Sequence, residues 1–143
     1  MMSTIPTVQP FRYMLDTNII AYARNKRPPS VLEALLKHDP SEICISAITM
    51  AELDFGVFNS SDPQKNRMAL MLFLSGITVL PFDKAASLEY GSIRHYLKTN
   101  GIIIGGNDML IAAHARSMDI TLVTHNTKEF SRVPGLNIED WAV

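Results

Sequence analysis

Short apolar segments alternate with helical stretches along most of the chain. Extended segments are predicted at 12–15, 43–45, 77–82 and 121–124, because apolar and β-branched residues gather there between polar turns. Helices are expected after the first three segments, and helix caps are predicted at Asp16, Ser30 and Asp83. A further short strand is expected near the C-terminus. Strands that alternate with helices indicate an α/β fold around a mainly parallel sheet. In such a sheet, ligands bind beyond the carboxyl ends of the strands.

The length and composition indicate one globular domain. The chain has 143 residues, of which 47% are hydrophobic and 19% are charged, a balance unlike that of a disordered protein. Residues 1–10 contain two prolines and no amphipathic period, so they are predicted to form a flexible N-terminal extension to a domain that spans 11–143. No stretch reaches the length of a membrane span, and the single cysteine fits a reducing compartment. We therefore expect a cytoplasmic protein that does not bind membranes.

Three acidic residues lie where apolar segments give way to helices: Asp16, Glu52 and Asp108. Each alone has a structural explanation, since Asp16 could cap a helix, Glu52 could form a capping box with Thr49, and Asp108 could favour a helix N-terminus. However, Glu52 and Asp108 share helical faces with apolar residues, so both are predicted to point toward the core. Buried carboxylates need a cation. The pattern therefore favours a metal site over three unrelated caps.

The ligand type indicates which metal is expected. Carboxylate oxygens without a cysteine or histidine cluster favour Mg²⁺, or Mn²⁺ as a substitute, and Mg²⁺ commonly bridges to substrate phosphates. The four histidines are scattered; His114 is predicted to be a partly exposed helix residue, and His125 a loop residue for which a minor substrate contact remains open. The net charge is only −1, so any nucleic-acid contact must be local.

The basic loop after the first helix is the candidate for that contact. Arg24, Lys26 and Arg27 could reach RNA phosphates, although a short basic loop can equally be a solvated surface. The apolar stretch 68–74 has two interpretations as well. It could contact a protein partner, but we favour a position in the core.

Several segments together resemble the VapC toxins, a group of PIN-domain ribonucleases from bacterial toxin–antitoxin pairs. The segments that carry the resemblance are 14–20, 45–56, 104–116, 122–130 and 139–141, and their order and spacing are specific. The resemblance implies a PIN-like three-layer α/β/α sandwich. It also implies Mg²⁺-dependent cleavage of RNA by Asp16, Glu52 and Asp108, with the fourth acidic position of the family on Asn126.

Further expectations follow from the same resemblance. They are a VapB-type antitoxin that covers the acidic pocket, a homodimer, and a tRNA substrate, with cleavage of initiator tRNA in the anticodon loop as the candidate reaction. The chain departs from the family pattern at two positions: Asn126 adds no charge, and Gly106 replaces a proline common before the Asn107–Asp108 pair.

The alternative function is a non-catalytic PIN-like module that binds RNA or protein, but such a module is expected to lack a metal-binding acid. A Rossmann domain is disfavoured because no G-x-G-x-x-G loop is present.

Overall fold

The centre of the protein is a five-stranded parallel sheet. The computed structural model describes residues 11–143, so the expected N-terminal extension, residues 1–10, lies outside the described residues. The strands are β1 (Tyr13–Leu15), β2 (Ile43–Ser46), β3 (Thr78–Leu80), β4 (Thr121–Val123) and β5 (Ile138–Glu139). Their order is β3-β2-β1-β4-β5, and every neighbouring pair is parallel. The prediction of a parallel α/β sheet is confirmed, with β3 shorter than predicted because Pro81 cannot donate to a ladder hydrogen bond.

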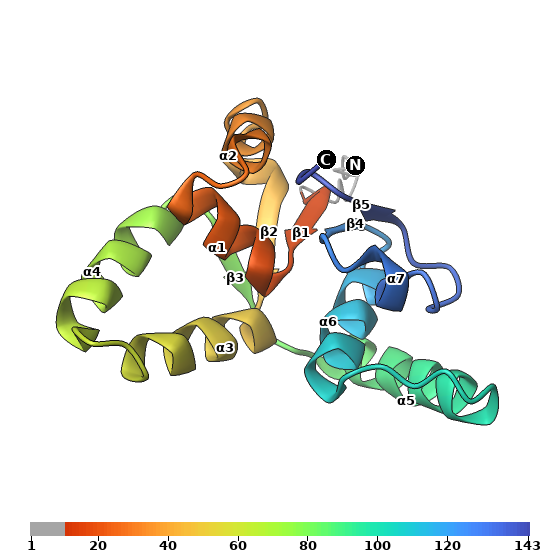
Figure 1. Ribbon diagram of the computed structural model, residues 1–143. Helices are drawn as coiled ribbons and strands as arrows, with labels where there is room; N and C mark the ends of the chain where they lie inside the picture. The colour runs from red at the N-terminus through yellow and green to blue at the C-terminus, as the bar shows by residue number, and fades with distance from the viewer. Residues whose placement is uncertain (1–10) are drawn as a thin grey trace, which may run out of the picture.

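Helices cover both faces of this sheet, which gives the three-layer α/β/α sandwich (Figure 1). The helices are α1 (Thr17–Asn25), α2 (Pro29–Leu36), α3 (Ala47–Phe58), α4 (Pro63–Leu74), α5 (Lys84–Thr99), α6 (Gly106–Ser117) and α7 (Thr127–Phe130), with a 3₁₀ turn, η1, at Pro40–Glu42. Helices α1 to α4 lie on one side of the sheet, and α5 to α7 lie on the other.

The alternation of side chains along the strands separates the two cores. Met14 and Leu122 point into the core formed with α5, α6 and α7, whereas Leu15 and Val123 point into the core formed with α1 to α4. All four side chains are completely buried. The strands are only two to four residues long, so the sheet depends on these two helical layers to bury its faces.

Helix caps show where local prediction succeeds and where it fails. The predicted cap Asp83 is confirmed, since its carboxylate accepts a hydrogen bond from the N–H of Ala86 (3.0 Å). The capping box of Thr49 and Glu52, which was the structural alternative for Glu52, does not form: Ser46 caps α3, and Thr49 is buried inside the helix. The predicted cap Ser30 is wrong, because α2 already begins at Pro29, a favoured first helical position.

The apolar stretch of α4 is only partly a core element, which corrects the interpretation favoured from the sequence. Leu70 and Leu74 are buried, but Met68, Met71 and Leu72 are exposed by 69%, 56% and 71%.

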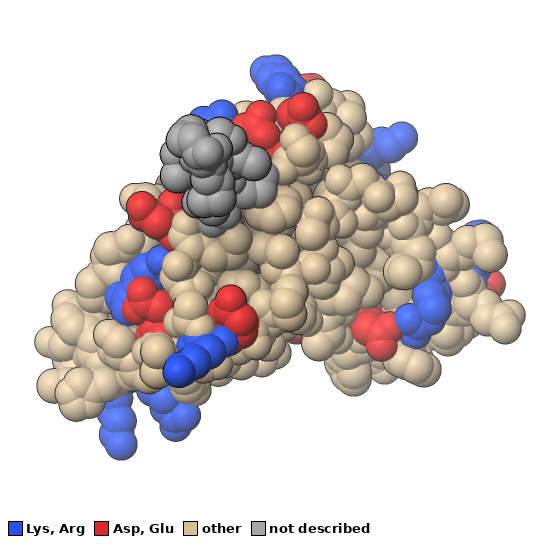
Figure 2. All heavy atoms as spheres, turned by 180° about the vertical axis from the view of Figure 1, so that it is seen from behind, with Lys and Arg blue, Asp and Glu red and all other residues tan. Residues whose placement is uncertain are grey.

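Figure 2 shows charged side chains in small groups of both signs, without a basic stripe on the face that it presents. Within residues 11–143, no helix is long and apolar enough to span a membrane.

Candidate active site

Asp16 is held at the carboxyl end of β1 by two hydrogen bonds. Its Oδ1 accepts from the N–H of Asn18 (2.9 Å), which caps α1, and its Oδ2 accepts from the hydroxyl of Thr124 (2.6 Å) at the end of β4. The side chain is almost completely buried. Burial raises the pKa of Asp16, the two hydrogen bonds oppose this rise, and the charge of Glu52 adds to it. Asp16 is thus both a cap and a buried carboxylate under electrostatic stress.

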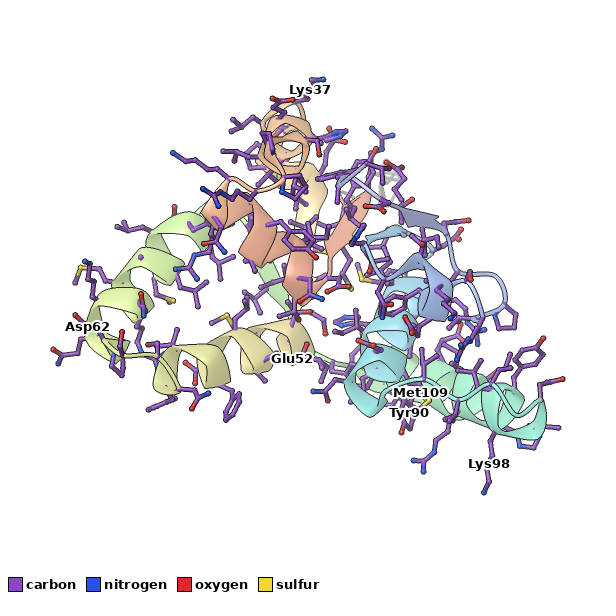
Figure 3. The ribbon with its side chains drawn as sticks, in the orientation of Figure 1. Lys37, Glu52, Asp62, Tyr90, Lys98 and Met109 are labelled. Carbon is purple, nitrogen blue, oxygen red and sulfur yellow. The ribbon has the colours of Figure 1, made fainter. Side chains whose placement is uncertain are left out.

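Glu52 connects the starts of two other helices. One carboxylate oxygen accepts from the hydroxyl of Thr17 in α1, and the other accepts from the side-chain amide of Asn107 in α6 (3.3 Å). Figure 3 shows Glu52 in the part of α3 that lies close to α1 and α6, and Asp62 at the far end of the α3–α4 hairpin. The carboxylate therefore reaches the same edge of the sheet as Asp16.

Asp108 lies in the first turn of α6 and carries the strongest sign of crowded negative charge. Its pKa is raised to about 6, first by burial and then by the charges of Asp16, Glu52 and Glu129. The structure thus brings together the three predicted acids, which are far apart in the sequence. It also adds Glu129 of α7, which the sequence analysis did not single out. Its position one helical turn after Asn126 was the available signal.

These oxygens suit a hard divalent cation by chemical type and by charge. A cation would relieve the unfavourable burial and mutual repulsion that raise the pKa values of Asp16 and Asp108. Across residues 11–143, however, no three His, Cys, Asp or Glu side chains are already arranged to hold a metal ion. The hydrogen bonds that Glu52 and Asp16 make to Thr17, Asn107 and Thr124 keep the carboxylates engaged separately.

Asn126 follows the same strand as Thr124. It is the N-cap residue of α7 but makes no side-chain cap bond, and its backbone N–H donates to the Thr124 hydroxyl (2.9 Å). Because Thr124 also donates to Asp16, the backbone N–H of Asn126 lies next to the acidic site. The side chain of Asn126 is not used as a helix cap.

The basic loop divides into one residue near the site and two away from it. Arg24 lines a groove together with Asn18, Glu52 and Asn66, so it lies on a continuous surface with the acidic site. Lys26 and Arg27 do not line this groove. Lys26 instead ends α1 in the left-handed conformation, with φ of 57°.

His114 is buried, so the prediction of a partly exposed helix residue is wrong. Its Nδ1 lies 2.8 Å from the hydroxyl of Ser46, and burial lowers its pKa, opposed by the charge of Asp83. Helix α6 packs against both α5 and α3, which leaves this face no access to water. The contact connects α6, which carries Asp108, to Ser46, the N-cap of the helix α3 that carries Glu52.

Comparison with known proteins gives consistent similarities. The family model described as PIN domain matches residues 13–136. The chain is 46% identical over 132 residues to Ribonuclease VapC2 from Rickettsia felis, covering 90% of this chain and 97% of the relative. It is 41% identical over 131 residues to the tRNA(fMet)-specific endonuclease VapC from Shigella flexneri, covering 92% and 98%.

A solved structure has a similar fold. The crystal structure of VapBC2 from Rickettsia felis, bound to a DNA fragment from their promoter, contains a chain that superimposes with a TM-score of 0.84 at 42% identity. The match covers 92% of this chain and 99% of that chain.

Proposed function

The chain belongs to the PIN-domain family, as one of its VapC ribonucleases, and from this premise we propose that it is the toxin of a VapBC-type pair that cleaves RNA at the acidic site. The observation that carries the proposal is the gathering of Asp16, Glu52 and Asp108 at one sheet edge, with the pKa of Asp108 raised to about 6 by burial and by its acidic neighbours. Carboxylates whose pKa values are raised by burial and by charged neighbours are typical of functional sites.

PIN-domain ribonucleases depend on divalent metal ions, and we propose Mg²⁺, with Mn²⁺ as a substitute, for this chain. Asp16, Glu52 and Asp108 would hold the ion, and the side-chain oxygen of Asn126 is a further acceptor without charge. When bound, the ion supplies a water of lowered pKa and offsets negative charge on the scissile phosphate.

The residues of the chain perform the remaining tasks. Thr124 and the N–H of Asn18 orient the carboxylate of Asp16, while Thr17 and Asn107 orient that of Glu52. Glu129 adds negative charge to the site, which compensates in part for the neutral Asn126. Arg24 lines the groove that continues from Glu52, where a phosphate of the RNA would be attracted. Lys26 and Arg27, which do not line this groove, are proposed as weaker phosphate contacts.

The proposed substrate is initiator tRNA. The support is the relative from Shigella flexneri, which is named as a tRNA(fMet)-specific endonuclease and matches over 92% of this chain. The alternative of a non-catalytic PIN-like module is disfavoured because all three acids are present and the charges of Asp16 and Glu52 both act on Asp108. A tRNA substrate also agrees with the expected cytoplasmic location.

We also propose a VapB-type antitoxin as the partner, in keeping with the VapBC complexes among the structural relatives. The exposed apolar face of the α3–α4 hairpin is its proposed contact surface. It comprises Phe55, Phe58, Met68, Met71 and Leu72, each more than half exposed. An exposed apolar face of this extent indicates a protein interaction site. Homodimerisation remains a prediction, which sedimentation of the purified toxin with and without antitoxin would test.

The decisive experiment is cleavage of purified tRNA with and without Mg²⁺. We expect cleavage of initiator tRNA that requires the metal, is lost in Asp16→Asn, and stops when antitoxin is added. Asn retains the cap of α1, so this variant should remain folded. Sequencing the fragment ends gives the cleavage position. Tight RNA binding without any cleavage in Mg²⁺ or Mn²⁺ would favour the non-catalytic module instead.

A further inference from the structure

The C-terminal segment at 139–141 belongs to the family pattern, but the acidic site does not explain it. Trp141 is buried, and its Nε1 donates to Glu139 (3.0 Å). The indole stacks on His38, with ring centroids 5.1 Å apart and planes at 11°. Strand β5 pairs with β4, with Glu139 opposite Val123. These contacts place Asp140, which lies between Glu139 and Trp141, next to the loop that follows β4.

Asp140 holds one specific side chain in that loop. Its Oδ2 lies 2.9 Å from Nδ1 of His125, and its Oδ1 accepts from the backbone N–H of Ala142 (2.8 Å). The carboxylate side chain is 14% exposed, whereas the imidazole is 51% exposed. A mostly buried carboxylate thus orients a ring that remains open to solvent. Ordering an exposed ring costs side-chain entropy, which the contact with Asp140 offsets.

His125 belongs to the loop next to the acidic site, between two residues of one chain of hydrogen bonds. The preceding residue, Thr124, donates to Asp16, and the N–H of the following residue, Asn126, donates to Thr124. A second ring approaches from α1, the helix that Asp16 caps: the ring of Tyr22 has its centroid 6.0 Å from that of His125, with the planes at 73°. Two rings from different elements therefore lie together at the loop that joins Thr124 to Asn126.

Proteins that recognise unpaired nucleotides stack the bases on aromatic and histidine side chains. Base stacking matters more for RNA binding by this protein, because its net charge is −1 and its acidic site repels phosphate. We propose that His125, oriented by Asp140 and flanked by Tyr22, forms a subsite that stacks on the base of a nucleotide next to the scissile phosphate. This subsite rests on the proposed ribonuclease function and adds base recognition to it. Asp140 is a positioning residue, which acts only through His125.

The first test uses a short RNA with the mapped cleavage site, in which each flanking nucleotide in turn is made abasic. For the parent protein, we expect one abasic position to raise KM about 10-fold, within the range expected for loss of one stacked base, with little change in kcat. His125→Ala should raise KM for the intact RNA by a similar factor and should not respond to that abasic position. His125→Phe should keep the response, because it retains a stacking ring. His95→Ala, which removes an exposed histidine on α5, is the matched control.

The second test measures stacking without catalysis. RNA with 2-aminopurine at the sensitive position is mixed with protein in EDTA, where we expect fluorescence quenching by the parent and by His125→Phe but not by His125→Ala. Asp140→Asn keeps an acceptor oxygen and should quench like the parent, whereas Asp140→Leu should quench less. A merely structural role of Asp140 would instead lower the melting temperature in both Asp140 variants without separating their quenching.

The outcomes distinguish this subsite from the proposed function itself. If the parent protein cleaves RNA but His125→Ala shows the same abasic sensitivity and the same quenching, the base is bound elsewhere and the subsite is refuted. If the parent protein does not cleave any RNA in the presence of metal, the proposed function fails, whatever the quenching shows.

Discussion

Replacing Asp108 by Asn should stabilise the metal-free protein while removing its activity. Raising the pKa of Asp108 from 3.8 to about 6 corresponds to about 3 kcal/mol of unfavourable free energy for its ionised form in the folded state. Solvent screening of this partly exposed carboxylate reduces the figure to about 1–2 kcal/mol. Asn also loses the favourable interaction of a carboxylate with the N-terminus of α6, about 0.5 kcal/mol. A net gain of about 1 kcal/mol remains, or about 3 °C in Tm.

The pH dependence gives the sign of this effect. Because the folded-state pKa of Asp108 is raised, the folded protein binds a proton between pH 3.8 and about 6 that the unfolded chain does not bind. The parent therefore loses stability as the pH rises through this window, and the full loss is present above pH 6. The advantage of Asp108→Asn should be largest near pH 7.5 and should disappear near pH 4.

The assay is thermal unfolding of both proteins in EDTA at several pH values, with Glu33→Gln on α2 as the control for removal of an exposed carboxylate. Addition of Mn²⁺ should make the parent more stable than the variant. The ion stabilises the folded parent by binding to it, whereas the variant lacks one carboxylate ligand. If Asp108→Asn is no more stable than the parent at pH 7.5 in EDTA, burial and neighbouring charge do not destabilise the ionised form of Asp108, and the reasoning is refuted.

Three further predictions concern the surroundings of Asp108. Asn126→Asp should bind Mg²⁺ or Mn²⁺ more tightly in calorimetric titration, since it adds a fourth metal-facing carboxylate; equal affinities would mean that this side chain points away from the ion. Glu129→Gln should lower the pKa of Asp108, measured by NMR titration of the metal-free protein, and weaken metal binding less than Asp108→Asn does; an unchanged pKa would remove Glu129 from the site. Neutralising Arg24, Lys26 and Arg27 together should weaken RNA binding and flatten its salt dependence, with most of the effect from Arg24; a salt slope equal to that of the parent would identify all three as solvated surface.

The elements could be predicted from the sequence because their signals are local. Short apolar segments between turns locate the strands, and Asp16 and Asp83 locate two helix starts, since a cap needs only neighbouring residues. Where two local signals compete, prediction fails. Ser46 and Thr49 are both good caps, and β2 ends at Ser46, so the earlier residue caps α3 and Thr49 becomes part of the buried helix.

The environment of each functional side chain was beyond local prediction. Asp16 meets Thr124 across 108 positions of sequence, and His114 meets Ser46 across 68. Nothing near His114 indicates that α6 will lie between two other helices, so its burial was missed. Glu129 was overlooked for the same reason, because its effect on Asp108 depends on the docking of α7 at the sheet edge.

The sequence by itself determined the order of strands and helices and the identity of the three acids, because hydrophobic periodicity and capping act within one or two helical turns. Only the tertiary structure decided which carboxylates lie close enough to affect one another, which apolar residues of α4 remain exposed, and which histidine remains open to solvent. These properties depend on distance and burial between segments that are far apart in the chain. Both the pKa of Asp108 and the orientation of His125 arise only when those segments pack together.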